Sequence, residues 1–135
     1  MGIPLTNLPA KLRAQVDPDM PQALLPGVTP EAREKAVAKN EREIQRDIAN
    51  LLRQRGIWHV QSRMDRKTSN TVGTPDFLFP HRSRWVAWEV KCPWSPRLRP
   101  EQAEARDAIL RQGGVWQLIT SCQQAREHLA ELEAN

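Results

Sequence analysis

Three charged side chains in the middle of the chain could share one site. Asp76 is followed thirteen residues later by Glu89, and Lys91 comes two residues after that. Side chains alternate between the two faces of a β-strand, so Glu89 and Lys91 should point the same way on a strand. An aspartate on a neighbouring strand can meet them there. Because holding such charges together is costly, this pattern favours catalysis over a structural role.

This arrangement is typical of a site for a divalent metal ion. Carboxylate oxygens are the ligands that Mg2+ prefers, so we expect Asp76 and Glu89 to bind it and the main-chain carbonyl of Val90 to add a third oxygen. Such an ion polarises a phosphate and acidifies a water molecule in phosphodiester cleavage. Lys91 would lie beside it, where it could orient the attacking water or stabilise the developing charge.

A long helix is expected before these strands. Thr29 and Pro30 are typical of a helix start, and Gly56 is typical of a left-handed stop. Glu41 falls within the apolar stripe of this helix, whereas Glu43 lies on the far side. A carboxylate on that stripe needs a partner or a metal ion, unless this part of the helix emerges into solvent. The stripe consists of Val37, Ile44, Ile48, Leu51 and Leu52.

The remaining sequence alternates between strand and helix patterns. We expect strands at residues 57–60, 74–79, 84–91 and 115–119, and helices that begin near residues 100 and 121. Residues 80–83 should form the turn of a hairpin. A helix joins the last two strands, so these two should be parallel. The order α-β-β-β-α-β-α predicts an α/β fold with a mixed four-stranded sheet flanked by helices.

Five short motifs follow one another along the chain: Glu41-Arg42-Glu43-Ile44-Gln45, Gly73-Thr74-Pro75-Asp76, Trp88-Glu89-Val90-Lys91, Leu98-Arg99-Pro100-Glu101-Gln102 and Gly113-Gly114. In this order they resemble the VRR-NUC branch of the PD-(D/E)XK nuclease superfamily. The resemblance covers roughly residues 40–130, and five ordered motifs are far more specific than any one of them. The proline-rich loop at residues 92–96 departs from the family pattern.

The resemblance implies a restriction-endonuclease-like core and Mg2+- or Mn2+-dependent cleavage of DNA. It assigns Asp76 and Glu89 as metal ligands and Lys91 as the catalytic lysine. Glu41 would be the acidic residue of the first helix, and Gln102 a polar residue of the second helix near the phosphate. Small stand-alone members are similar to dimeric junction resolvases, so the resemblance also implies a homodimer that acts on branched DNA such as a Holliday junction.

Charge is distributed unevenly along the chain. The net charge is +4, yet residues 53–99 carry ten basic and three acidic groups, while residues 100–135 carry three and six. A basic surface around an acidic metal site suits a polyanionic substrate; a solvated basic face is the alternative. We expect phosphate contacts from loop residues that flank the site, namely Arg63, Arg66, Lys67, Arg97 and Arg99.

Proline and cysteine usage gives the remaining expectations. Residues 1–28 hold five of the eleven prolines and should form an extended arm, which leaves residues 29–135 as the nuclease-like domain. Cys92 and Cys122 form no C-x-x-C motif and are typical of reduced thiols in a cytosolic setting. With no leader pattern and no apolar run of membrane-spanning length, we expect a cytoplasmic protein, of a phage or of its host, without membrane contact.

The tryptophans and the rival functions leave alternatives open. All five tryptophans could stack on unpaired bases. Trp58, Trp85, Trp88 and Trp116 lie on predicted strands, which favours the core for them, whereas Trp94, in a loop, could equally pack, stack on a base or contact a second subunit. One rival function is a nucleic-acid-binding protein that keeps the nuclease fold without turnover. The other is an assembly protein in which the acidic cluster is structural.

Overall fold

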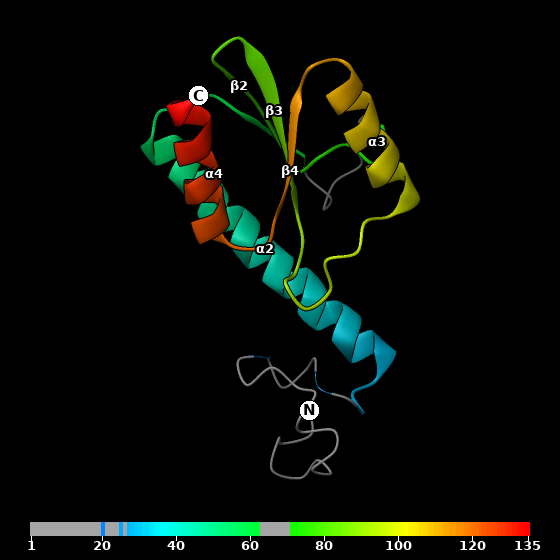
Figure 1. Cartoon of the computed structure of the whole chain (residues 1–135). Helices are drawn as coiled ribbons and strands as arrows, with labels where there is room; N and C mark the ends of the chain where they lie inside the picture. Colours follow the sequence, from blue (N-terminus) through cyan, green and yellow to red (C-terminus); the bar gives the residue numbers. More distant parts are fainter. Residues whose placement is uncertain (1–19, 21–24, 26, 63–70) are drawn as a thin grey trace.

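In the computed structural model, residues 20, 25, 27–62 and 71–135 are described. They form three α-helices and one four-stranded sheet (Figure 1). The expected arm at residues 1–28 lies almost entirely outside this part of the chain. In chain order the elements are α2 (Pro30–Gln54), β1 (Val60–Gln61), β2 (Phe77–His81), β3 (Arg84–Val90), α3 (Pro100–Arg111), β4 (Val115–Ile119) and α4 (Cys122–Ala134).

The sheet is mixed and has the order β1-β2-β3-β4. The pairs β1–β2 and β2–β3 are antiparallel, whereas β3 and β4 are parallel and are joined through α3. Helices α2 and α4 lie on one side of the sheet and α3 lies on the other (Figure 1). The expected α/β class, the hairpin and the parallel pair are therefore confirmed.

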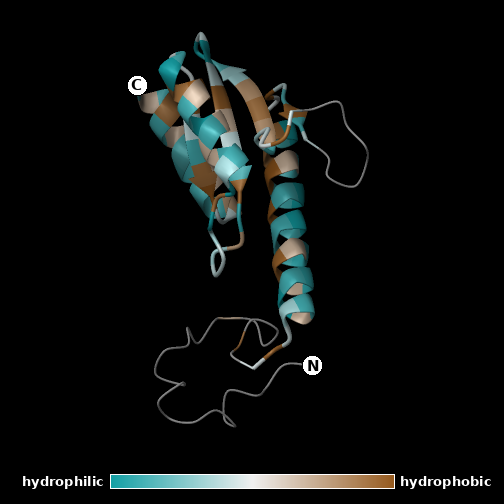
Figure 2. Cartoon of the chain, turned by 90° about the vertical axis from the view of Figure 1, so that its right-hand side faces the viewer, coloured by the Kyte–Doolittle hydropathy of each residue, from teal (hydrophilic) through white to brown (hydrophobic). Residues whose placement is uncertain are grey.

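The hydrophobic core lies between the sheet and the pair formed by α2 and α4. Ile48 and Leu52 of α2 and Leu129 of α4 are fully buried against Phe77 and Trp88 of the sheet. Hydrophobic residues follow the flank of α2 that faces the strands, while its outer face is hydrophilic (Figure 2). Burying the apolar stripe of an amphipathic helix in this way supplies most of the stability of such a layer.

Helix α2 begins and ends where its sequence predicts. The Thr29 hydroxyl accepts a hydrogen bond from the Ala32 N–H at 3.2 Å, and Gly56, just beyond the helix, has a φ of 66°. Its fully buried residues begin only at Ile48, because the first half of the helix extends past the end of the sheet (Figures 1 and 2). Among the described residues, no helix is both long and apolar enough to cross a membrane.

Three strands differ from the expected boundaries, and of these β3 differs least, since it ends at Val90 rather than at residue 91. The second strand was expected at 74–79 but runs over Phe77–His81, because the Thr74 N–H bonds to the Thr71 carbonyl in a turn. Pro80 is tolerated inside β2 because the N–H that proline lacks would point toward β1, not toward β3. The pairing of β1 with β2 ends at Val60 and Leu78, so no ladder hydrogen bond is lost at Pro80. The first strand starts at Val60 rather than at residue 57, because only Val60 and Gln61 pair with residues of β2.

The hairpin turn is shorter than expected. His81 pairs with Arg84, which leaves only Arg82 and Ser83 as the loop in place of residues 80–83. Both have positive φ angles, 48° and 70°, and this combination matches the right-handed twist of the strands that a two-residue turn joins.

The tryptophans divide between core and surface. Trp88 is fully buried and Trp116 is half-buried, whereas Trp58 and Trp85 are 65% and 54% exposed. The expectation that all four belong to the core is therefore wrong for Trp58 and Trp85. Both lie away from α2 and α4, on the opposite side of the sheet from Trp88, so the main core does not cover them.

Candidate active site

The strand register brings the predicted carboxylates together. Phe77 pairs with Trp88, and the next step of this antiparallel register sets Asp76 opposite Glu89. Lys91 follows two residues later on the same face. All three side chains are buried, at 7%, 3% and 7% exposure. The structure thus gathers two acids and one base at the end of the sheet where β2 begins.

Asp76 is held from two directions. Its Oδ2 accepts a hydrogen bond from the Val90 N–H at 2.7 Å, and its Oδ1 accepts one from the Gln45 side-chain amide at 3.1 Å. Gln45 lies on α2, one turn after Glu41, on the flank that faces the sheet. Both oxygens of the aspartate are therefore oriented by groups from separate elements.

Glu89 is held by a helix-capping residue. Gln102 donates from its side-chain amide to the Glu89 Oε1 at 2.7 Å, while its own oxygen accepts the Arg99 N–H at 2.9 Å. The cap at the start of α3 thereby fixes which end of the amide points at the carboxylate. The Lys91 ammonium lies 3.8 Å from the same Glu89 oxygen. Gln102 is thus a positioning residue in this structure.

Glu41 reaches the same region from α2. Its Oε1 accepts the Cys92 N–H at 3.3 Å, and it is half-buried, whereas Glu43 is exposed. The expected helix phase, with Glu41 and not Glu43 on the inward flank, is confirmed. Its negative charge acts on the carboxyls of both Asp76 and Glu89.

Burial and like charge make the two central carboxyls weak acids. The pKa of Asp76 is raised to about 6, chiefly by burial and then by Glu41, against the Val90 N–H and Lys91, which lower it. The pKa of Glu89 is raised to about 8, chiefly by burial and then by the charge of Asp76, and Lys91 again opposes the shift. Near neutral pH the pair therefore tends to share a proton unless a cation compensates its charge.

The backbone groups of Val90 face the segment that carries Asp76, whose Oδ2 accepts the Val90 N–H. The Lys91 N–H bonds to the Ile119 carbonyl of β4, so the backbone groups of Val90 face the other way, toward β2. If the β2–β3 register is continued by two residues beyond Phe77 and Trp88, Pro75 falls opposite Val90, and a proline has no N–H to donate. The proline of the Gly73-Thr74-Pro75-Asp76 motif thus leaves the Val90 carbonyl without its partner in the ladder.

These groups fit a hard divalent cation. Among the described residues, no three or more His, Cys, Asp and Glu side chains lie close enough to hold a metal ion by themselves. Mg2+, however, commonly takes one or two carboxylates and keeps several water molecules, so Asp76, Glu89 and the Val90 carbonyl make a suitable oxygen set. The raised pKa values fit the same conclusion, because a bound cation would favour the ionised carboxylates.

Gly73 explains the close approach of the loop before Asp76 to α3. Its φ is 89°, and a Cβ at this position would lie 2.3 Å from the Glu101 carbonyl oxygen. Only glycine permits both the backbone conformation and this contact. The contact anchors the segment that carries Asp76 against the first turn of α3, which carries Gln102.

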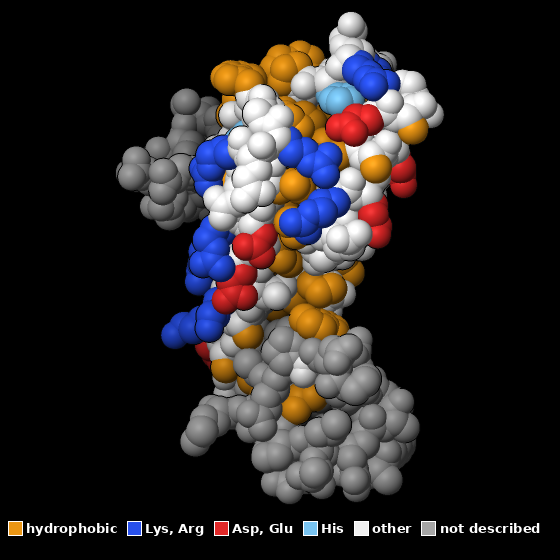
Figure 3. Space-filling model, turned by 90° about the vertical axis from the view of Figure 1, so that its left-hand side faces the viewer, with side chains coloured by type: hydrophobic (Ala, Val, Ile, Leu, Met, Phe, Trp, Pro, Cys, Tyr) orange, Lys and Arg blue, Asp and Glu red, His pale blue; other side chains and the backbone are white. Residues whose placement is uncertain are grey.

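The expected phosphate-binding residues are only partly described. Arg63, Arg66 and Lys67 lie outside the described residues. Arg97 and Arg99 are exposed in the loop between Lys91 and α3. Acidic and basic side chains are interspersed on the face of the molecule that Figure 3 shows.

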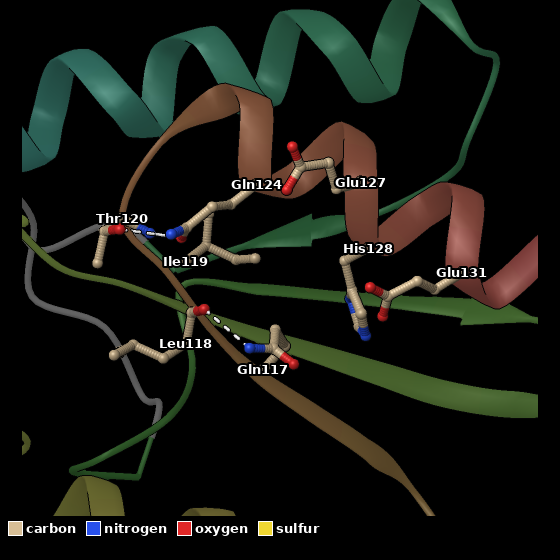
Figure 4. Close-up of a pocket in the computed structure, with 8 residues that line it drawn as sticks. All are labelled: Gln117, Leu118, Ile119, Thr120, Gln124, Glu127, His128 and Glu131. Carbon is tan, nitrogen blue, oxygen red and sulfur yellow. Dashed lines mark hydrogen bonds between the residues drawn. The ribbon is translucent and has the colours of Figure 1, made fainter.

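A separate cavity of about 380 Å³ lies between β4 and α4. His128 and Glu131 project from α4 toward Gln117 of β4 (Figure 4). The Gln117 side chain donates a hydrogen bond to the Leu118 carbonyl, and the Gln124 side chain accepts one from the Thr120 N–H. Two glutamine side chains therefore hydrogen-bond to backbone groups beside the outer edge of β4. None of the carboxylate-site residues lines this cavity.

One site residue escaped the sequence-based set. Gln45 is the last residue of the first motif, but its role does not follow from the sequence, because its contact with Asp76 spans 31 residues. Its i+4 spacing from Glu41 on the inward flank was the available signal. Comparisons with protein-family models, curated proteins and solved structures found no match for this chain.

Proposed function

We propose that this protein is a metal-dependent endonuclease that cleaves DNA. The observation that carries the proposal is the pair of buried, opposed carboxylates, Asp76 and Glu89, with the buried Lys91 beside them. Groups this costly to bury are concentrated at functional sites. A restriction-endonuclease-like core and membership of the VRR-NUC branch are part of this proposal, and the five ordered motifs that resemble that branch support them.

Asp76, Glu89 and the Val90 carbonyl would hold Mg2+ or Mn2+. When bound, the ion would polarise the scissile phosphate and lower the pKa of a coordinated water molecule. Gln45 and Gln102 keep the two carboxylates oriented, so little reorganisation is needed on binding. The metal requirement is thus the first property to test.

Lys91 supplies the only cation whose side chain is buried among the described residues of this site. Its ammonium lies within an ion-pair distance of Glu89, where it can hold a water molecule by hydrogen bonding or stabilise negative charge on a phosphate. Glu41 lies on the same side and can accept a proton or position a water molecule. Removal of Lys91 should therefore affect catalysis more than binding.

Branched DNA is the proposed substrate, and a homodimer the proposed assembly. The high positive charge of residues 53–99 suits the phosphate backbone, whose recognition does not depend on sequence. A two-fold dimer would present two sites for paired cuts. Sedimentation would give about twice the 15.5 kDa chain mass if the dimer forms.

The decisive experiment offers four-way junction, flap, splayed and linear DNA to the purified protein with Mg2+, Mn2+ or chelator. We expect metal-dependent cleavage, and a loss of at least about 100-fold in Asp76→Ala and Lys91→Ala while folding and DNA binding persist. Lys39→Ala, an exposed lysine on α2, is the matched control. Full activity in either site variant refutes the mechanism, and binding without cleavage in the wild type would favour a non-catalytic nucleic-acid-binding protein.

A further inference from the structure

Two exposed tryptophans remain without a role in the proposed chemistry. Trp58 and Trp85 are 65% and 54% exposed, whereas Trp88 is fully buried. An indole left in water forgoes a large amount of apolar burial, so two of them on one surface suggest a ligand or a partner.

Strand pairing places these tryptophans on one face. Trp85 pairs with the exposed Pro80, and Leu78, two residues before Pro80, pairs with Val60. Trp58 precedes Val60 by two residues and shares its side by alternation. The side chains on either side of Trp58 in the sequence point to the core instead. Ile57 packs against the core, and the centre of the His59 ring lies 5.9 Å from that of the Phe77 ring. Trp58 and Trp85 thus lie on one face of the sheet, with the exposed ring of Pro80 beside Trp85, and we call the two indoles with this proline the aromatic strip.

The aromatic strip and the carboxylate site share this face. Glu89 follows Trp85 by four residues on β3, and Asp76 precedes Pro80 by four. Both pairs therefore point the same way, and four residues of strand span about 13 Å at about 3.3 Å per residue. This distance corresponds to about four steps of a stacked strand at about 3.4 Å each. A strand whose phosphate reached the carboxylates could place nearby bases on the strip.

We propose that Trp58 and Trp85 stack on unpaired bases of the DNA strand that enters the carboxylate site. The inference rests on the proposed function and narrows its substrate to DNA with single-stranded nucleotides near the cut. Indole faces stack on any base, and the basic segment 53–99 that contains both tryptophans attracts the phosphates between them. In a duplex the faces of the bases are already stacked and hidden.

The test measures binding without cleavage. Full-length protein in chelator is titrated with oligothymidylate and with blunt duplex, and tryptophan fluorescence and anisotropy are followed. We expect the oligonucleotide to quench the wild-type fluorescence, and the double variant Trp58→Leu/Trp85→Leu to bind it at least tenfold more weakly with unchanged duplex affinity. The double Phe variant should retain most of the affinity, because phenylalanine still stacks. Leu110→Ala, an exposed apolar side chain on α3, serves as the matched control.

The outcomes are separable from those of the cleavage experiment. Wild-type affinity in the double Leu variant, or an equal loss of duplex affinity, overturns the stacking role even if the protein cleaves DNA. A halved mass in solution for that variant also overturns it, because the strip would then be a subunit interface. Quenching and selective loss without metal-dependent cleavage in the wild type would retain the stacking role and remove the nuclease proposal.

Discussion

At the scale of single residues, the site is an assembly of charges that oppose folding. The buried carboxyls of Asp76 and Glu89 lie near one ammonium, that of Lys91, and the charge of Glu41 acts on both carboxyls as well. A carboxyl whose pKa is higher in the folded than in the unfolded state binds its proton more tightly when folded. Folding is therefore weakened as the pH rises through the interval between the two values.

Glu89→Gln should stabilise the metal-free protein at alkaline pH. The folded pKa of Glu89 is about 8 and its ordinary value is 4.5, so the wild type loses stability progressively between these values and keeps the full loss above pH 8. At pH 9 in chelator we expect the variant to unfold with a free energy roughly 1–3 kcal/mol higher, a gap that closes toward pH 4.5. Denaturant titrations at both pH values measure it. A variant less stable than the wild type at pH 9 would contradict this sign.

Glu41 and Glu43 form a matched pair of acids on one helix. Glu41 reaches the site, whereas Glu43 faces solvent. Glu41→Ala should lower the cleavage rate roughly tenfold or more, while Glu43→Ala should change it by no more than about twofold. Single-turnover rates at saturating Mg2+ make the comparison. The reverse order would mean that the inward flank of α2 does not serve the site.

At the scale of elements, three contacts tie separate segments into one site. Gln45 joins α2 to the segment before β2, Gln102 joins α3 to β3, and Gly73 allows the loop before Asp76 to lie on α3. Because these segments are anchored to different helices, a shift of one helix would move some of the site residues and leave the others in place, which would change the distances between them. Small backbone changes should therefore affect activity strongly.

Gly73→Ala and Gly56→Ala separate backbone strain from a direct clash. Both glycines have positive φ angles, which cost other residues roughly 1–2 kcal/mol. Gly56 has no atom within 4 Å of its Cβ position, whereas at Gly73 the Glu101 backbone lies 2.3 Å away. Gly56→Ala should lose only the strain energy and keep its activity. The Gly73→Ala variant should lose more stability than Gly56→Ala and should lose most of its cleavage activity. Thermal unfolding and cleavage assays measure both properties, and equal losses in the two variants would exclude the clash at Gly73.

At the scale of the whole molecule, one buried polar contact joins the sheet to α4. The Trp88 indole N–H donates to His128 Nδ1 at 2.8 Å within the core. Burial lowers the pKa of His128 from 6.5. The unfolded chain binds a proton below pH 6.5 that the folded protein resists, so this contact is fully effective above pH 6.5 and weakens as the pH falls. The acidic site has the opposite trend.

His128 variants should reveal this contribution. His128→Ala leaves the Trp88 N–H without its acceptor and should cost roughly 1–3 kcal/mol near pH 7. His128→Asn can accept at the same position and does not titrate, so it should lose less stability than the wild type between pH 7 and pH 5. Urea midpoints across this range measure both effects. A wild-type profile as flat as that of His128→Asn would contradict the lowered pKa.

The sequence predicted the elements wherever local chemistry specifies them. Thr29, Pro30 and Gly56 bound α2, Ser121 caps α4 through its hydroxyl, and the apolar stripe fixed the phase that turns Glu41 inward. The edges of β1 and β2 were misplaced, because a strand ends where its neighbour stops pairing, and that depends on residues far along the chain. The exposure of Trp58 and Trp85 was not predicted for a related reason: a position on a strand does not reveal which face of the sheet is covered.

The sequence by itself determined which residues could converge, because strand alternation makes Glu89 and Lys91 share a face whatever lies around them. Only the tertiary structure decided what surrounds them. It brought Asp76 beside Glu89, brought Gln45 across 31 residues to Asp76, and directed the Val90 N–H at the Asp76 carboxylate. Periodicity is encoded locally, but register, burial and charge proximity depend on how distant segments pack together, and these three decide the properties of the site.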